Sequence, residues 1–218
     1  MKWVLGTLVL LLILFAYFYK IAPPVLRGKF GEVFVKFALG RNKAGKQHII
    51  NNVTVVVDEK SRQIDHILVN DHGIFCIETK NYSGRIYGDS DQLQWTQVLA
   101  YGKEKNKLYN PVKQNWTHVK RLSQLLNAEY PIYSLVVFVQ SNTRYINANN
   151  VVGLCGIQSF LRETGSPEAL SPEQIDSLAQ QIQTLKDSNT VTTKEHISEI
   201  RQMQENVKNN ICPRCVAP

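Results

Sequence analysis

The sequence predicts an α/β domain, with a mixed central β-sheet flanked by helices, preceded by one transmembrane helix. Three observations support this class. An uncharged apolar run occupies residues 3–19. The 218 residues suffice for one domain of ordinary size beside such a segment. After the run, the hydrophobic periodicity follows the order helix, strands, helix, strand, strand, helices, which is typical of a sheet covered by helices.

Residues 1–22 are predicted to form a membrane anchor. The seventeen residues from Trp3 to Tyr19 carry no charge. At about 1.5 Å per residue, a helix of this length is near the minimum for crossing a hydrocarbon core of roughly 30 Å. Trp3 and Tyr19 at its ends fit interfacial aromatic belts. A cleaved signal peptide is the alternative, but it needs small residues at the cleavage site, and the run continues as Phe-Tyr-Lys-Ile-Ala-Pro-Pro.

The net charge of +7 is concentrated next to this anchor. Residues 1–46 contain eight basic residues against Glu32 alone, which accounts for the whole excess. Most of these charges follow the apolar run, so the positive-inside rule predicts a single-pass inner-membrane protein of bacterial type with its globular domain in the cytoplasm. A second basic cluster could meet phosphates or could simply be a solvated face; it comprises Lys103, Lys105, Lys107, Lys113, Lys120 and Arg121.

The first half of the domain is predicted to be a helix followed by strands. Phe30, Val33, Phe34 and Phe37 form an apolar stripe at helical spacing, so residues 28–39 are expected to be a helix. The turn Asn-Asp-His-Gly at 70–73 separates two strand-like runs. The strands expected in this half are residues 48–57, 62–69, 74–80, 84–88 and 92–99.

The second half returns to helices. Pro111 suits the first position of a helix of about 15 residues. Residues 132–139 are apolar throughout, which predicts a strand buried on both faces. The remaining elements are a strand at 150–155 and polar helices at 171–186 and 192–208. We therefore divide the chain into an anchor at 1–22, a domain at 23–160, C-terminal helices at 161–210 and a tail at 211–218.

Two carboxylates and a lysine are predicted to converge on one face of the sheet. Glu78 and Lys80 are two apart on one strand, so they point to the same side. If the turn centres on Asp71 and His72, Asp65 lies directly opposite Glu78, with Cβ atoms roughly 4.5–5.5 Å apart. Opposed like charges destabilise a sheet, and a divalent cation would compensate for them. The alternative is a cross-strand ion pair without metal.

A metal site and an ion pair make different predictions for stability. If Asp65 and Glu78 form a site for Mg²⁺ or Mn²⁺, their carboxylates repel each other without metal. Removing one charge by Glu78→Gln should then leave the metal-free stability unchanged or raise it. If the residues form only a structural pair with Lys80, the same change should destabilise the domain. A metal held here would polarise a phosphoryl oxygen and activate water, which is the chemistry of phosphodiester hydrolysis.

Four short motifs follow one another along the chain: Gly28–Glu32, Gln63–His66, Gly73–Gly84 and Asn110–Gln114. In this order they resemble the PD-(D/E)XK nuclease superfamily and, within it, the nuclease-related domain (NERD) family, over roughly residues 27–140. Ile64 stands where the superfamily motif has proline. The resemblance implies a restriction-endonuclease-like fold and an Mg²⁺-dependent nuclease that acts on DNA. It also implies that Glu32 joins Asp65 and Glu78 as a metal ligand, and that Gln114 lies near the catalytic residues Asp65, Glu78 and Lys80.

Two functions of other classes compete with the nuclease. One is a non-catalytic nucleic-acid-binding module, and the other is a membrane-associated interaction module whose basic juxtamembrane segment meets anionic lipid. The expected partners are DNA and, through residues 3–19, the membrane; no feature of the sequence indicates an oligomeric state. The presence of all five candidate residues, Glu32 and Gln114 among them, favours the enzyme, because a binding module has no need of the full set.

Several other features are given structural interpretations. Residues 40–46 nearly spell a phosphate-binding loop, but Gln47 replaces the required Ser or Thr. His66 alternates to the face opposite Asp65 and is expected to pack in the core. Cys76 and Cys155 are expected to be buried thiols, and Trp95 and Trp116 to be core residues. Cys212 and Cys215 resemble the first half of a zinc ribbon, and since a closed site needs four ligands, we expect no zinc in this chain alone.

Overall fold

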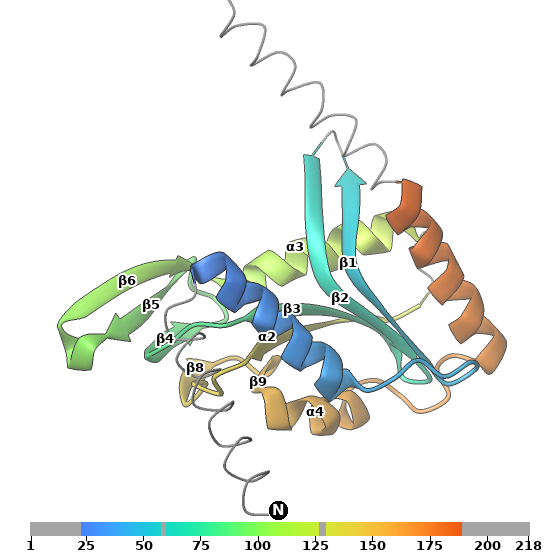
Figure 1. The fold of residues 1–218 in the computed structure, drawn as a ribbon. Helices are drawn as coiled ribbons and strands as arrows, with labels where there is room; N and C mark the ends of the chain where they lie inside the picture. Colours follow the sequence, from blue (N-terminus) through green and yellow to red (C-terminus); the bar gives the residue numbers. More distant parts are fainter. Residues whose placement is uncertain (1–22, 58–59, 127–129, 189–218) are drawn as a thin grey trace, which may run out of the picture. The chain divides into compact units, whose positions relative to one another are not determined.

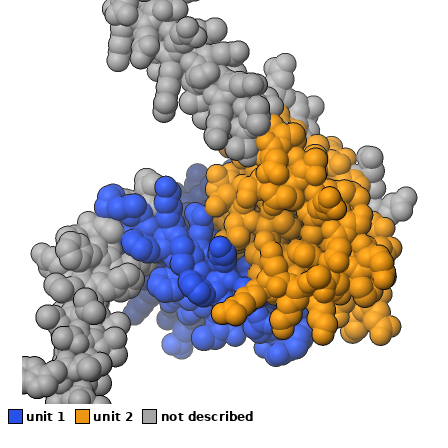
Figure 2. All heavy atoms as spheres, turned by 45° about the vertical axis from the view of Figure 1, so that its right-hand side comes forward, with its two compact units in different colours: residues 1–40, 78–115, 135–163 blue, residues 41–77, 116–134, 164–218 orange. Residues whose placement is uncertain are grey.

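The computed structural model describes residues 23–57, 60–126 and 130–188. The chain forms two compact units, shown in blue and orange in Figure 2. Unit 1 comprises Met1–Gly40, Glu78–Asn115 and Leu135–Glu163, and unit 2 comprises Arg41–Ile77, Trp116–Ser134 and Thr164–Pro218. The class is mixed α/β, as predicted, but with two mixed sheets where the sequence indicated one. Their strand orders are β1-β2-β3-β7-β9 and β6-β5-β4-β8.

In unit 2, three antiparallel strands follow one another along the chain. β1 (Gln47–Val57) pairs with β2 (Lys60–Asn70), which turns through two residues into β3 (Gly73–Lys80). The pairing of β2 with β3 runs from Asn70–Gly73 to His66–Ile77. This is the predicted register. It follows from the two-residue turn, because a slip by one residue would move every apolar side chain to the other face.

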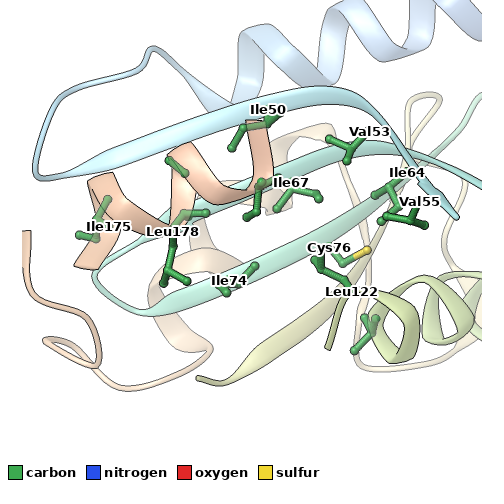
Figure 3. Packing of buried hydrophobic residues seen from close by; sticks show 14 of the residues in the cluster. Ile50, Val53, Val55, Ile64, Ile67, Ile74, Cys76, Leu122, Ile175 and Leu178 are labelled. Atoms are coloured by element: carbon green, nitrogen blue, oxygen red, sulfur yellow. The ribbon is translucent and has the colours of Figure 1, made fainter. Parts of the chain in front are cut away.

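The core of unit 2 is an aliphatic cluster on one face of these strands (Figure 3). Ile74 and Cys76 alternate along β3 and point into the cluster, as does Ile64 of β2. Cys76 is buried as predicted. α3 (Pro111–Leu125) contributes Leu122, and the helix at residues 172–188 contributes Leu178. That helix begins with a capping box. The backbone N–H of Gln174 donates to Ser171 Oγ, and the backbone N–H of Ser171 donates to the Gln174 side-chain Oε1.

Unit 1 holds the smaller core and the second sheet. Its sheet consists of β4 (Arg85–Asp89), β5 (Gln94–Leu99) and β6 (Glu104–Tyr109), which are antiparallel, and β8 (Tyr145–Asn147), which runs parallel to β4. Trp95 and Ile86 pack with Val136 and Phe138 of β7 (Ile132–Phe138). The last four residues of β7 are fully buried, as its apolar sequence predicted, and Trp95 is the expected core residue.

The helix predicted at residues 28–39 is present and begins four residues earlier. α2 spans Pro24–Leu39, but its phenylalanine stripe faces outward, and Phe37 is 79% exposed. The buried side carries Gly31, Val35 and Leu39, which recur every four residues. A Cβ at Gly31 would lie only 3.1 Å from Val139 and 3.2 Å from Asn81. The backbone of α2 therefore lies too close to these residues for large aromatic side chains to fit on that side.

Several elements escaped the sequence prediction or differ from it. Pairing with β5 holds β6 in place, yet nearly all its side chains are exposed, so it has no apolar signature. β8 and α4 (Ile157–Glu163) are too short to show a period. The strand expected at 150–155 is β9 (Val151–Gly153), followed by the 3-10 turn η2 (Leu154–Gly156). This turn carries Cys155 into solvent, contrary to its predicted burial.

Trp116 was also expected in the core, but it is 62% exposed on α3. Among the residues that the structure describes, no helix is long and apolar enough to span a membrane. The predicted anchor, the helix expected at 192–208 and the pair Cys212 and Cys215 lie outside the described residues.

Candidate active site

The centre of the candidate site is a buried ion pair at the end of β3. Glu78 and Lys80 point to the same side of the strand, and Lys80 Nζ lies 2.6 Å from Glu78 Oε1. Glu78 is only 4% exposed, at the end of a strand that is otherwise buried and apolar. Burying a carboxylate is costly unless it is paired and hydrogen-bonded. The lysine supplies the opposite charge that this position requires.

Gln114 of α3 closes a triangle with the pair. Its side-chain amide donates from Nε2 to Glu78 Oε1 at 2.7 Å, and its Oε1 accepts from Lys80 Nζ at 3.0 Å. The amide therefore complements both charges at once. An amide is suited to this role because it carries a donor and an acceptor on one planar group. These hydrogen bonds restrain the rotamers of all three side chains.

Asn110 explains why α3 begins where Gln114 can reach the pair. This residue is fully buried and precedes Pro111, the first residue of the helix. Its Oδ1 accepts from the Val112 N–H at 2.8 Å, which is an N-cap hydrogen bond. Its Nδ2 is within hydrogen-bonding distance of three carbonyl oxygens in the β4–β5 loop, those of Asp89, Ser90 and Gln92. Asn110 thus ties the start of α3 to that loop, one helical turn before Gln114.

Glu32 reaches the site from α2. The close approach at Gly31 and a hydrogen bond from Asn81 Nδ2 to the Arg27 carbonyl, 2.6 Å long, hold this helix beside the end of β3. Burial raises the pKa of the Glu32 carboxyl above its ordinary value, and the negative charge of Glu78 raises it further, while Lys29 acts in the opposite direction. Glu32 and Glu78 thus share one electrostatic environment, but only Glu78 has a lysine hydrogen-bonded to it.

The predicted acidic partner Asp65 lies on β2, in unit 2. Its neighbour His66 is paired with Ile77, so the register is the one that predicted Asp65 beside Glu78, although the described pairing ends one residue earlier. His66 itself is buried, with Nδ1 2.7 Å from Asn51 Oδ1, as expected of a packed histidine. Within the described part of the chain, no group of three or more His, Cys, Asp or Glu side chains is arranged to hold a metal ion.

The structure therefore brings together Glu78, Lys80 and Gln114 directly, and joins Glu32 to them through its charge. Sequence reasoning missed the role of Asn110, although an Asn before a Pro at the first helical position is an N-cap signal. It also missed Asn81, whose bond to the α2 backbone left no pattern in the sequence. The site thus combines a carboxylate and a lysine two residues apart on a strand with an amide from a neighbouring helix.

Comparison with known proteins identifies the family of the chain. The model of the nuclease-related domain family matches residues 27–139, more than half of the chain, and the protein belongs to that family. An uncharacterized protein of Bacillus anthracis is 36% identical over 116 residues, which cover 53% of this chain and 54% of that protein. The chain thus spans about half the length of this curated relative. No solved structure matches the chain.

The two glutamates are predicted to respond in opposite ways to loss of their charge. Without metal, Glu78→Gln leaves buried Lys80 without its counter-charge, and we expect a loss of about 2 kcal/mol of stability. Because the ion pair and the Gln114 bond compensate for the charge of Glu78, this loss is expected whether or not the site binds a metal, and only stabilisation of the wild type by added metal separates the two alternatives. Glu32→Gln should instead raise Tm slightly near neutral pH. Thermal melting in chelator measures both, with exposed Glu163→Gln on α4 as control.

The pH dependence gives the Glu32 prediction its sign. Because its pKa is raised by folding, the folded state holds this proton more tightly than the unfolded chain does, and stability falls as pH rises from the ordinary carboxyl pKa through the raised one. Glutamine mimics the protonated form. The gain in Tm for Glu32→Gln should therefore vanish below about pH 4. A variant that melts below the wild type near neutral pH would show that the ionised Glu32 is stabilising.

Asn110→Ala is predicted to destabilise the domain by about 1–3 kcal/mol, because it removes a helix cap and the amide that donates to the Ser90 and Gln92 carbonyl oxygens. Chemical denaturation measures the loss. Asn106→Ala, at an exposed position of β6, is the matched control and should cost much less. Equal stability of the two variants would contradict the anchoring role of Asn110.

Proposed function

We propose that this chain is a membrane-anchored, metal-dependent nuclease that hydrolyses phosphodiester bonds of DNA. The observation that carries the proposal is the triangle of Glu78, Lys80 and Gln114, with Glu32 coupled to it by charge. Membership of the nuclease-related domain family supports the reaction class. We assign β1-β2-β3-β7-β9 to a restriction-endonuclease-like central sheet, with the site at the end of β3.

The donor chemistry of the site fits Mg²⁺ or Mn²⁺. Glu32 and Glu78 offer hard carboxylate oxygens, and the raised pKa of Glu32 reflects a charge that a nearby cation would favour. We propose these two residues as ligands, with Asp65 as the third on the strength of its motif and register. When bound, such an ion supplies Lewis-acid polarisation of a phosphoryl oxygen and a more acidic water.

The chain's own residues perform the remaining roles in this proposal. Lys80 is the catalytic cation, whose ammonium group can donate to an oxygen of the attacked phosphate and stabilise the negative charge that develops there. Gln114 is a positioning residue, because its Oε1 accepts from Lys80 Nζ and holds that side chain in place. Glu78 anchors both side chains by accepting from each. Since these groups are preorganised by α3, no rearrangement of the chain is needed to assemble them.

The proposed anchor would hold this site beside the cytoplasmic face of the inner membrane. Residues 3–19 supply the apolar length, and the basic residues that follow supply the orientation. The exposed apolar stripe of α2, which includes Phe34 and Phe37, begins shortly after this run and is consistent with a position next to lipid. The site would then meet DNA, and not periplasmic substrates.

The nuclease proposal is tested with the full chain in detergent, incubated with plasmid and linear DNA in chelator, Mg²⁺ or Mn²⁺. We expect cleavage with metal only, reduced about 100-fold or more by Lys80→Ala, since that change removes the transition-state cation. Glu78→Gln should abolish cleavage and the thermal stabilisation that metal gives the wild type. Lys36→Ala, at an exposed position of α2, is the matched control. DNA binding without cleavage under every metal condition would favour the non-catalytic binding module.

The topology prediction uses reporters fused after Pro218. A reporter that works only in the cytoplasm should be active, because the charges after Tyr19 hold that side inside. A periplasm-dependent reporter should be silent. The opposite pattern would overturn the orientation and, with it, the access of the site to DNA.

A further inference from the structure

The sheet β6-β5-β4-β8 has one buried face and one exposed face, and both lie within unit 1. On the buried face, Ile86 and Trp95 pack in the core. Gly88 belongs to the same face, where a Cβ would collide with the Trp95 ring. Strand alternation then places Arg85 and Tyr87 on the opposite, solvent-facing side. We call this side the outer face; these strands are drawn in green and gold in Figure 1.

Cross-strand pairing arranges the outer face in two rows. The first row contains Lys107 of β6, Thr96 of β5, Tyr87 of β4 and Tyr145 of β8, which are successive register partners. The Tyr87 and Tyr145 rings are stacked, with centroids 4.7 Å apart and planes at 19°. These two residues are 38% and 41% exposed, respectively. A cation therefore stands at one end of the row and aromatic rings at the other.

The second row repeats the basic character. It contains Lys105, Val98 and Arg85, and the two charged residues are exposed. Arg144 lies beside the first row, with its guanidinium carbon 5.6 Å from the centre of the Tyr145 ring. The three cations of the two rows and Arg144 beside them thus surround a pair of stacked rings. The carboxylate that alternation places on this face is Asp89, beyond Tyr87, where Asn147 donates to it.

The hairpin that ends β5 and begins β6 adds a third aromatic group. Ala100 and Tyr101 both adopt the left-handed backbone conformation, with φ of 46° and 55°. This conformation costs roughly 1–2 kcal/mol for each L-residue other than glycine. Its consequence is that the Tyr101 ring is fully exposed at the tip of the hairpin, near Lys103. A strained turn that holds an aromatic ring in water is typical of a contact surface.

We propose that the outer face binds single-stranded nucleic acid, with bases extending the Tyr87–Tyr145 stack and phosphates meeting Lys105, Lys107 and Arg85. Exposed rings flanked by cations are the chemistry that recognises unpaired bases, because every base has a π-face and the backbone is a polyanion. A duplex would satisfy the cations but would keep its bases stacked on one another. The inference deepens the proposed function by naming the substrate form, so it rests on that function for its role.

The position of Asp89 indicates which way the backbone of a bound strand runs across the outer face. Hydrogen bonds from the Asp91 N–H and the Asn147 amide lower the pKa of Asp89, so this carboxylate is ionised at neutral pH. Its charge repels phosphate from the Asn147 end of the sheet. The backbone of a bound strand is therefore directed towards β6 and the basic rows.

The test is fluorescence anisotropy with the full chain in detergent and chelator, so that binding is measured without cleavage. The probes are oligo-dT, oligo-U and a DNA duplex of equal length. We expect single strands to bind more tightly than the duplex, and oligo-dT compared with oligo-U shows whether DNA or RNA is preferred. Lys105→Gln with Lys107→Gln should lower the slope of log affinity against log salt by about 0.7 for each lysine, and Lys36→Gln should not.

The stacking contribution is isolated by paired substitutions at Tyr87 and Tyr145. The double change to Phe keeps the rings and should bind nearly as well as the wild type. The double change to Leu keeps apolar bulk without a π-face and should weaken single-strand binding about tenfold or more. Trp116→Leu, an exposed aromatic residue of unit 2, is the control. Equal binding by the Phe and Leu variants, or tighter binding of duplex by the wild type, would overturn the proposal.

These outcomes are distinguishable from failure of the nuclease proposal. Binding in chelator does not depend on Glu78 or metal, so a chain that binds single strands but never cleaves them supports the outer face and contradicts the enzyme. A chain that cleaves DNA with metal, while its Phe and Leu variants bind alike, supports the enzyme and contradicts the outer face.

Discussion

The burial of the Glu78 carboxylate is the constraint from which the candidate site follows. The strand that carries it is buried and apolar up to this residue, so a charge here must be compensated locally. Lys80 provides the charge and Gln114 provides a donor, both on the same carboxylate oxygen. The donor from Gln114 can reach Glu78 only if α3 begins at the right place. Asn110 sets that place by capping the helix and holding the β4–β5 loop. Replacing a buried ion pair with apolar residues of similar volume is often neutral for stability or even stabilising. On the proposed function, the pair is present for its chemistry.

The two glutamates of unit 1 occupy different electrostatic positions. Glu78 is paired, whereas the ionised form of Glu32 is disfavoured by burial and by Glu78 itself. On the proposed function, a carboxylate that the protein satisfies and a second that is held against repulsion would let the site bind a cation and remain folded without it. This asymmetry is not visible in the sequence, where both residues are simply acidic. It depends on Gly31, which lets α2 approach the end of β3 closely enough for the two charges to interact.

The sequence predicted what depends on local spacing. The register of β2 with β3 follows from a two-residue turn, and the common side of Glu78 and Lys80 follows from strand alternation. The position of Gln114 came only from the family resemblance, because its partners are 36 and 34 residues away and no period connects them. The sequence did not show which face of α2 is buried, because its larger apolar side chains form the exposed stripe and the small Gly31 marks the buried side. β6 was missed because an edge strand can be held by backbone pairing alone while its side chains stay polar.

A polyanionic substrate poses an electrostatic problem that the candidate site cannot solve by itself. Glu32 and Glu78 repel phosphate, and Lys80 is already engaged by Glu78, so little positive charge is left there to attract a nucleic-acid backbone. The attraction must come from cations that have no carboxylate partner. Arg85, Lys105 and Lys107 on the outer face meet this requirement, since none of them forms a salt bridge among the residues that the structure describes, and Lys107 donates to the neutral Thr96 hydroxyl. The same strand alternation that buries Trp95 places these cations in solvent. On the proposed function, one sheet therefore stabilises the fold with one face and collects substrate with the other, while the end of β3 supplies the chemistry.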